Sequence, residues 1–277
     1  MSSPRLWAMR TAFRAVGAVA PGVAARWAET LFCTPPRRAG GDASFLASGT
    51  RFTVESQGQR LAGWEWGVGP TVVLAHGWGS RAARFGALGR ALLQAGFRVV
   101  AYDAPAHGES TGRFASLPEF ARALGDVAAH LGPVHGMVGH SLGGAAVAMA
   151  MRQGAAARRA VLLAPPADVR IFSDLFARSL AIAPAVQETM HRNLERRLRI
   201  VWSDLHIPTL VRELPAAALV IHDRDDADVP YAHGEEIVGA WSGSRLESTS
   251  GLGHRALLRD PSVIARTVAF LCEDLLG

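Results

Sequence analysis

The stretch MVGHSLGG at residues 137–144 decides the fold, because it places Ser141 between Gly139 and Gly143 behind an apolar run. A G-x-S-x-G pattern alone is weak, since chance produces it about 0.2 times in a chain of this composition. Here the small-residue run LGGAAVAMAM follows it directly. This setting predicts a sharp strand-to-helix turn that presents the serine hydroxyl at a helix N-terminus, where developing negative charge is favoured. The alternative is a glycine-rich packing turn.

Short apolar runs and helical patterns alternate on both sides of this stretch. The runs TVVLAHG, RVVAYDAP, RAVLLAPPA and AALVIHDRD predict buried strands, and residues 82–95, 117–131, 235–241 and 261–276 predict helices. FTVESQG and RLAGWEWG alternate like two antiparallel strands joined at Gln57-Gly58. The pattern therefore predicts an α/β fold, with a mostly parallel central sheet of about eight strands, an antiparallel edge and helices on both faces.

Two segments depart from this alternation. Residues 1–50 are predicted to form a helical N-terminal extension, and residues 51–277 the main domain. Residues 170–215 carry no strand signal, and Val186, Met190, Leu194 and Leu198 recur at helical spacing. We expect this insert to form a helical cap over a pocket. Candidate lining residues are Phe172, Leu175, Phe176 and Met190, with plain core packing as the alternative.

Composition narrows the class of protein. The chain has 277 residues, a formal charge of +5 and 49% hydrophobic residues, so a large core is expected and disorder is not. All basic residues are arginine, which is typical of a GC-rich, bacterial genome; no aromatic and basic stripe indicates a nucleic-acid partner. Cys33 and Cys272 have no metal-binding spacing and favour a reducing, cytoplasmic compartment.

The N-terminal segment 1–28 contains no acidic residue and carries Arg5, Arg10, Arg14 and Arg26. Peripheral membrane contact, packing on the main domain and dimerisation are all open for it. A cleaved signal peptide is disfavoured because Gly17, Pro21 and Gly22 interrupt the apolar stretch. No apolar run approaches the roughly 18 residues that a membrane-spanning helix needs.

A serine hydroxyl needs a base, and the base needs a carboxylate that fixes its tautomer. In this fold class these partners follow the serine in the order acid, then histidine, on loops after later strands. The loop GLGH supplies His254 after the last strand run. The acid is ambiguous because Asp223, Asp225, Asp226 and Asp228 crowd one loop.

Four motifs, HGWGS, DAPAHGES, GHSLGG and the pair HDRDDADVP with GLGH, resemble the α/β-hydrolase superfamily from about residue 50 to residue 277. In relatives the catalytic Asp stands three residues before Val-Pro, which implies Asp226; Asp168 is the alternative acid of a rarer variant. Asp223 and Asp225 are then loop or salt-bridge residues, with Arg224 as a possible partner. The resemblance also implies an oxyanion hole formed by the backbone N–H groups of Leu142 and Trp78.

The remaining motif residues are given supporting roles by the same resemblance. His76 is expected to brace its loop and His107 to be structural, with Ala106 where relatives often have Gly. His140 is expected at the pocket wall or behind the site, and His233 on a surface helix without a role. The residues expected to support the site are Gly77, Gly139 and Gly143, together with His76 and His140.

Together these residues indicate a serine hydrolase that cleaves a carboxylic ester with an apolar or small acyl group through an acyl-enzyme, without cofactor or metal. A serine nucleophile argues against haloalkane dehalogenase and epoxide hydrolase chemistry, which need a carboxylate. Thioesterase, lactonase, amidase, carbon–carbon bond hydrolase, perhydrolase and acyltransferase remain alternatives. A ligand-binding protein without catalysis is disfavoured by the intact serine, acid and histidine.

Overall fold

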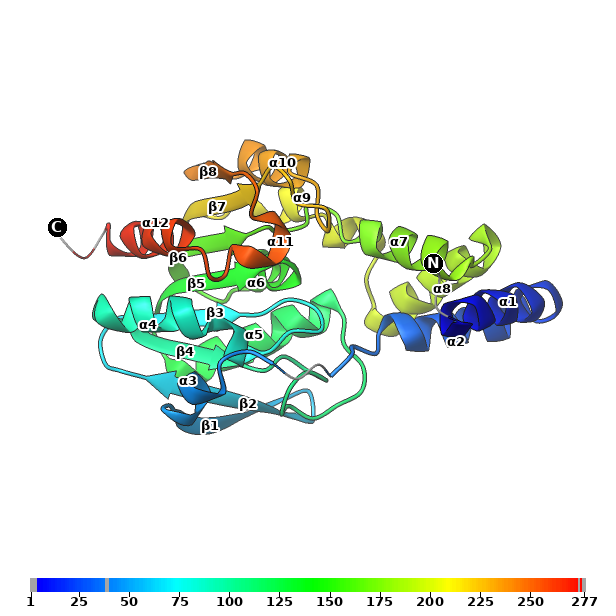
Figure 1. The fold of residues 1–277 in the computed structure, drawn as a ribbon, viewed down its shortest axis with the longest axis horizontal. Coiled ribbons are helices and arrows are strands. Elements are labelled where there is room, and N and C mark those ends of the chain that lie inside the picture. The colour runs from blue at the N-terminus through cyan, green and yellow to red at the C-terminus, as the bar shows by residue number, and fades with distance from the viewer. Residues whose placement is uncertain (1–3, 38–39, 274, 276–277) are drawn as a thin grey trace.

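The computed structural model describes residues 4–37, 40–273 and 275, and an eight-stranded sheet forms its centre (Figure 1). Its strands are β1 (Thr50–Ser56), β2 (Gln59–Trp66), β3 (Thr71–Ala75), β4 (Arg98–Tyr102), β5 (Val134–His140), β6 (Ala157–Leu163), β7 (Ala217–Asp223) and β8 (Ser244–Thr249). They lie in the order β1-β2-β4-β3-β5-β6-β7-β8. β2 pairs antiparallel with β1 and β4, and all other neighbours run parallel. The predicted α/β fold is confirmed.

The antiparallel edge begins with the predicted two-residue turn. Gln57 and Gly58 have φ angles of 51° and 71°, the left-handed conformation that tight hairpins require. This turn sets the register in which Ser56 faces Gln59.

Helices cover both faces of the sheet, because successive strand residues point to opposite sides. Val73, Met137 and Leu162 pack against α5 (Leu117–Leu131) and α6 (Leu142–Arg152). Their neighbours Val72 and Val138 pack on the other face, against α4 (Gly86–Gln94) and α12 (Pro261–Cys272). Each such Val or Leu contributes about 1.5–3 kcal/mol through its burial. The shorter or peripheral elements are α3 (Ala43–Ala47), η1 (Ala82–Phe85), η2 (Trp202–Leu205), α9 (Ile207–Val211), α10 (Ala232–Ala240) and α11 (Gly253–Ala256).

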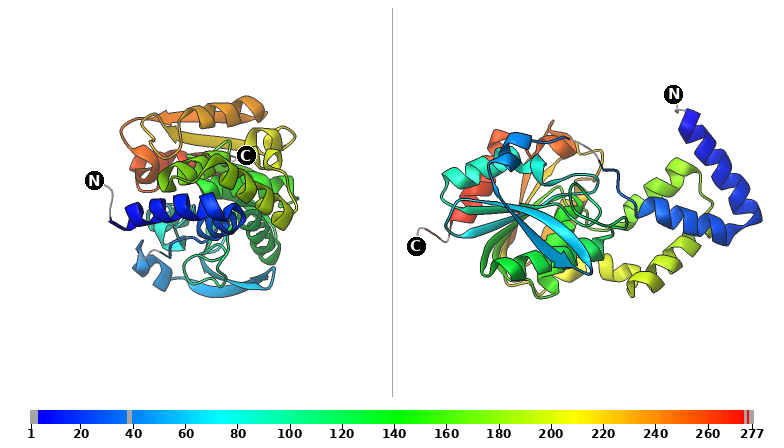
Figure 2. Two further views of the ribbon diagram at one scale, coloured as in Figure 1. Left: turned by 90° about the vertical axis from the view of Figure 1, so that its right-hand side faces the viewer. Right: turned by 90° about the horizontal axis from the view of Figure 1, so that it is seen from below.

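Four helices form a separate layer that projects from one side of the sheet domain, beyond the ends of the strands (Figures 1 and 2). They are α1 (Pro4–Val19), α2 (Pro21–Phe32), α7 (Arg170–Leu180) and α8 (Pro184–Leu198), here called the outer helical unit. Phe13, Ala28 and Val186 are among the residues of its own small core. The Phe13 and Trp27 rings stack with centroids 4.1 Å apart.

This packing brings together two segments that the sequence analysis treated separately. The N-terminal helices α1 and α2 share one core with the inserted helices α7 and α8. The division into an extension, a main domain and a cap stays a prediction. Residues 1–3, 38 and 39 of the predicted extension, and residues 274 and 276 of the predicted closing helix, lie outside the described residues, as does residue 277.

Candidate active site

Ser141 stands on a strained corner between β5 and α6. Its φ of 55° and ψ of −124° are unfavourable for a residue with a side chain. The corner is held because Ser141 N donates to Leu163 O at 2.8 Å. The flanking glycines are sterically required: a Cβ on Gly139 would lie 2.3 Å from Gly143 O, and one on Gly143 would lie 2.1 Å from Ala75 O. The strand-to-helix turn expected from the GHSLGG motif is therefore present.

Two backbone N–H groups beside Ser141 are available to a ligand. Leu142 is the first residue of α6, and Trp78 follows Gly77 in the loop after β3. Within the described chain, neither N–H donates a hydrogen bond. The two loops are close, since a Cβ on Gly77 would lie 3.0 Å from Ser141 Cβ. Such unpaired donors can stabilise an oxyanion.

Asp226 is the carboxylate that contacts His254. Its Oδ2 accepts a hydrogen bond from His254 Nδ1 at 2.7 Å, and its Oδ1 accepts from Asp228 N and Val229 N, each at 2.8 Å. Burial acts to raise the pKa of Asp226, but hydrogen bonds from His222 and His254 outweigh it and hold that pKa well below the usual range. The carboxylate is thus ionised and fixes the His254 tautomer with the proton on Nδ1.

The neighbouring acids have other roles. Asp223 accepts hydrogen bonds from Leu252 N and Gly253 N, at 3.1 and 3.0 Å, and so holds the loop before His254. Asp225 accepts from Gly251 N at 2.8 Å in the same loop. In the described chain neither acid pairs with Arg224, whose guanidinium instead lies 4.6 Å from the Tyr231 ring centroid. The proposed pairing with Arg224 is therefore wrong.

The alternative acid, Asp168, forms no hydrogen bond or ion pair with His254 among the described residues. Its Oδ1 accepts from Arg170 N at 2.8 Å at the start of α7. The structure thus joins His254 to Asp226 and uses Asp168 to organise a turn.

Ser141 and His254 line the same cavity, as expected, but no hydrogen bond joins the Ser141 hydroxyl to the imidazole among the described residues. Hydrogen bonds between a nucleophile and its base are often long without substrate and tighten when substrate binds. His140 fixes the other side of the His254 residue, since its Nε2–H donates to His254 O at 2.8 Å. The backbone of the base is therefore held independently of the serine.

The other histidines near the site are neutral structural groups. Burial lowers the pKa of His76 to about 4, and burial together with His76 lowers that of His107 to about 3. His76 Nε2 accepts from Ala104 N and His107 Nε2 accepts from Gly79 N, each at 2.9 Å. Burial and His254 lower the pKa of His140 to about 3. These contacts agree with bracing roles.

Ala106 has a φ of 63°, the conformation that explains why Gly suits this position. His233 is not a free surface residue: it is half-buried, and its Nδ1 accepts from Ala167 N at 3.0 Å, tying α10 to the loop after β6. The helical position alone did not reveal this contact.

A cavity of about 790 Å³ opens at Ser141, between the sheet domain and the outer helical unit. Phe172, Leu175 and Phe176 line it as expected, whereas Met190 is wholly buried among the outer helices. For Met190 the alternative of core packing therefore holds, because Met190 lies in the core that α8 shares with α1 and α2. The other apolar lining residues include Leu117, Leu194, Leu198, Ile200, Trp202 and Leu205.

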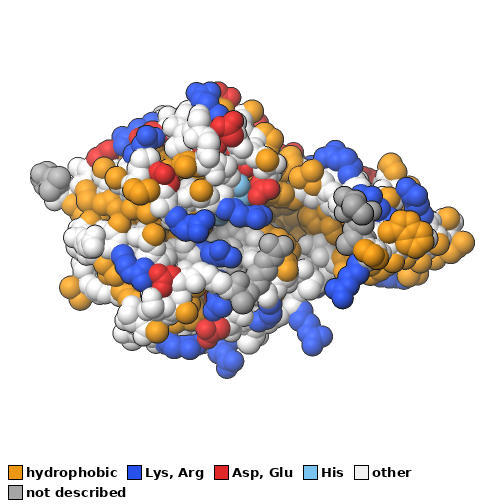
Figure 3. All heavy atoms as spheres, viewed as in Figure 1, with side chains coloured by type: hydrophobic (Ala, Val, Ile, Leu, Met, Phe, Trp, Pro, Cys, Tyr) orange, Lys and Arg blue, Asp and Glu red, His pale blue; other side chains and the backbone are white. Residues whose placement is uncertain are grey.

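Sequence reasoning missed five residues at this site, which belong to three different parts of it. Leu31 and Phe32 of α2 line the cavity, so the N-terminal segment takes part in it. His222 is fully buried beneath the acid, with Nε2 3.5 Å from Asp226 Oδ2. The exposed arginines Arg84 and Arg259 stand at the rim, and Figure 3 shows basic side chains beside this recess. Only the position of His222 at the end of a strand run gave any signal.

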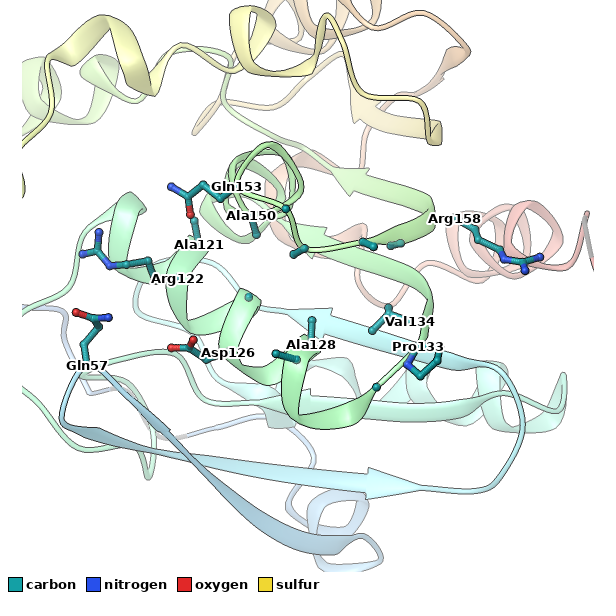
Figure 4. A pocket seen from close by; sticks show the side chains of 17 residues that line it. Gln57, Ala121, Arg122, Asp126, Ala128, Pro133, Val134, Ala150, Gln153 and Arg158 are labelled. Carbon is teal, nitrogen blue, oxygen red and sulfur yellow. The ribbon is translucent and has the colours of Figure 1, made fainter.

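A second hollow, of about 800 Å³, lies by the turn between β1 and β2 and beside α5 and α6 (Figure 4). Gln57, Arg122, Asp126 and Gln153 provide its polar side chains near α5 and α6. It contains none of Ser141, Asp226 and His254, so it is separate from the candidate active site. In the described part of the chain, no three His, Cys, Asp or Glu side chains are grouped as metal ligands.

A curated relative, a non-heme haloperoxidase of Rhodococcus erythropolis, is 34% identical over 132 residues. The match covers 44% of this chain and 47% of that protein, so it spans about half of the relative's length.

Solved structures share the fold. An esterase of Pyrococcus furiosus superposes with a TM-score of 0.68 at 20% identity, covering 86% of this chain and 98% of that one. A bromoperoxidase of Bacillus anthracis gives a TM-score of 0.63 at 18% identity, covering 81% and 100%. At these identities the likeness concerns the fold alone.

A family model described as "Serine aminopeptidase, S33" matches residues 68–224, which is more than half of the chain and includes the strand before HGWGS, the elbow and the end of β7. The match thus contains Ser141 and both candidate oxyanion donors. The chain belongs to this serine aminopeptidase family and, with it, to the α/β-hydrolase superfamily.

Proposed function

We propose that the chain is a serine hydrolase that cleaves carboxylic esters of apolar acyl groups. The observation that carries this proposal is the His254–Asp226 pair on the same cavity as the strained Ser141, beside two unpaired backbone N–H groups. Family membership supports a hydrolase but does not choose its substrate. The site geometry and the lining of the cavity carry that choice.

The proposed reaction has two steps. Ser141 Oγ attacks the ester carbonyl and passes its proton to His254 Nε2, while Asp226 stabilises the imidazolium. The oxyanion accepts hydrogen bonds from Leu142 N and Trp78 N. His254 then protonates the leaving alkoxide as the carbon–oxygen bond breaks. Water, deprotonated by His254, attacks the acyl-enzyme, and the acid leaves as Ser141 recovers its proton.

The cavity favours an apolar acyl chain. The helices α7 and α8 and the segment after them contribute aromatic and aliphatic side chains to its wall, and α2 adds Leu31 and Phe32. Burying apolar surface contributes about 25 cal/mol per Å², so a longer acyl chain gains affinity until the cavity is filled. The predicted helical cap is thus proposed to be the acyl-binding part of the site.

The rim disfavours a peptide with a free amino terminus, despite the family's description. Among the described residues that line the cavity, Asp228 is the one acid, and its Oδ2 already lies 3.3 Å from an Arg255 guanidinium nitrogen. Arg84 and Arg259 line the same cavity. A substrate ammonium group would meet net positive charge, so we place ester hydrolysis ahead of aminopeptidase activity.

The experiment is a panel of p-nitrophenyl esters of increasing chain length, assayed with the wild type and Ser141→Ala. We expect kcat/KM to rise from acetate to a medium-chain ester, and Ser141→Ala to lose at least about 10³-fold in rate. Retained turnover in Ser141→Ala would exclude this nucleophile. Added alcohol separates a transferase, which would divert the product from acid to a new ester.

A second candidate is perhydrolysis, which is favoured by the haloperoxidase relative. In that reaction hydrogen peroxide replaces water: its oxygen attacks the acyl-enzyme, the bond to Ser141 Oγ breaks, and a peracid forms that oxidises halide. Bromination of monochlorodimedone in acetate, peroxide and bromide tests it. Ester turnover without bromination would leave hydrolysis as the function.

From the two free cysteines we also propose a cytoplasmic location.

A further inference from the structure

The far end of the outer helical unit is formed by two apolar helix corners. The corner between α1 and α2 has the sequence AVAPGV at residues 18–23, in which Val19 is 84% exposed and Val23 50% exposed. The corner between α7 and α8 exposes Ala183, Pro184 and Ala185. We call residues 18–23 and 183–185 together the double corner.

The two corners lie side by side. A Cβ on Gly17, at the end of α1, would lie 3.5 Å from Val186 Cγ2, at the start of α8. Arg10 Nε also donates to Ser179 O at 2.7 Å, which ties α1 to the end of α7. The exposed apolar residues thus form one surface, and Figure 3 shows hydrophobic side chains gathered over this end of the molecule. A contiguous apolar surface of this kind marks a contact site.

Exposed arginines lie on three of the helices that form the double corner. Arg14, Arg26 and Arg178 are exposed on the helices that form the double corner. Residues 4–32 and 170–199 contain ten arginines and four acidic residues, a net charge of +6, whereas the whole chain carries +5. The remainder of the chain is therefore close to neutral, at −1. The nearest exposed acid after the second corner, Glu188, lies 3.5 Å from an Arg192 nitrogen.

We propose that the double corner docks on an anionic phospholipid surface. Its valines, alanines and prolines enter the boundary between headgroups and acyl chains, and Arg14, Arg26 and Arg178 bind lipid phosphates. Two features favour this partner: the apolar tip is flanked by arginines, and residues 4–32 and 170–199 carry a net charge of +6 while the rest of the chain carries −1. The same unit also lines the cavity, through Phe32 and Phe176.

Cosedimentation of the full chain with vesicles tests this proposal. We expect binding to vesicles of equal parts phosphatidylcholine and phosphatidylglycerol, and weak binding to phosphatidylcholine alone. Arg14→Glu with Arg26→Glu should weaken binding by at least about 25-fold, because each basic residue near an anionic surface is worth about a factor of five. Val19→Asp with Val23→Asp should weaken it more than about tenfold.

Val68→Asp is the matched control, because Val68 is 85% exposed but lies in the loop between β2 and β3, away from the outer helical unit. It should bind vesicles like the wild type. All variants should retain thermal stability and turnover of a short neutral ester, since the replaced side chains are exposed. Equal loss in Val68→Asp, or no preference for anionic vesicles, would overturn the proposal.

Sedimentation equilibrium tests the alternative partner for the double corner, which is a second copy of the chain. A dimer that Val19→Asp with Val23→Asp dissociates, without vesicle binding by the wild type, would overturn the lipid proposal. The vesicle assay does not depend on the chemistry of Ser141. Binding without ester turnover would therefore refute the proposed hydrolase function and leave lipid docking standing.

Discussion

Replacement of Asp226 by Asn tests the pairing of acid and base with almost no change in shape. Asp226 Oδ1 accepts from two backbone N–H groups, Asp228 N and Val229 N, so the amide oxygen of Asn must occupy that place. The amide nitrogen then faces His254 Nδ1, at the position where Oδ2 now lies at 2.7 Å. Because an amide nitrogen only donates, Nδ1 must become an acceptor, and the imidazole proton moves to Nε2.

The expected loss of kcat in Asp226→Asn follows from this change of the His254 tautomer. With a proton already on Nε2, His254 cannot accept the proton of the Ser141 hydroxyl, and the oxyanion donors alone remain. The same substitution in a Ser-His-Asp triad is worth about 10⁴-fold in kcat. This corresponds to about 5.4 kcal/mol of transition-state stabilisation. We expect kcat to fall by roughly that factor, with KM nearly unchanged.

The assay is ester turnover by Asp226→Asn and Asp228→Asn, with circular dichroism to show that both fold. Asp228→Asn is the matched control, since its exposed pair with Arg255 is worth at most about 1 kcal/mol. It should change kcat less than about fivefold. Asp226→Asn within tenfold of the wild type, or Asp168→Asn with the larger loss, would refute the assigned pair.

Three further predictions concern stability. Burial raises the pKa of Glu119 from 4.5 to about 7, so the folded chain binds a proton that the unfolded chain releases, and the wild type loses stability as the pH rises through that window. The Tm of Glu119→Gln should therefore rise relative to that of the wild type between about pH 5 and about pH 8. A Tm difference that does not change with pH would contradict this prediction. Gly143→Ala should lower the free energy of unfolding by about 1–3 kcal/mol or prevent folding, because the added Cβ would clash with backbone atoms. Gly125→Ala in α5, where the added Cβ meets open space, should raise the free energy of unfolding by about 0.5–1 kcal/mol. Denaturant titration measures both changes. The depressed pKa of Asp226 stabilises the fold above the ordinary Asp pKa, so the stability difference between the wild type and Asp226→Asn should shrink as acid protonates the carboxyl.

Local stereochemistry explains which features the sequence predicts well. The Ser141 corner needs glycine at positions 139 and 143 because the strand and helix backbones approach each other there, and these glycines can be read directly from the sequence. The buried strands are likewise visible as apolar runs, because both faces of a parallel sheet are covered. The residues alone left four acids open, and the resemblance to the α/β-hydrolase superfamily implied Asp226, whose Oδ1 accepts the Val229 N–H.

The sequence does not predict contacts between helices that are far apart along the chain. Glu29 of α2 lies 3.0 Å from an Arg197 guanidinium nitrogen on α8, across most of the chain, and no periodicity in either helix specifies that partner. The same packing decides that Met190 is core and that Phe32 lines the cavity. Arg224 and His233 were misjudged for a related reason, since aromatic and backbone partners are as available to them as carboxylates or water.

The most direct test of the account is to label the folded wild type with a fluorophosphonate and map the adduct by mass spectrometry. The account predicts one covalent adduct on Ser141, which should be absent from Ser141→Ala and much slower to form in Asp226→Asn. A folded, unlabelled wild type, or an adduct on another serine, would contradict the claim that Ser141 is an activated nucleophile.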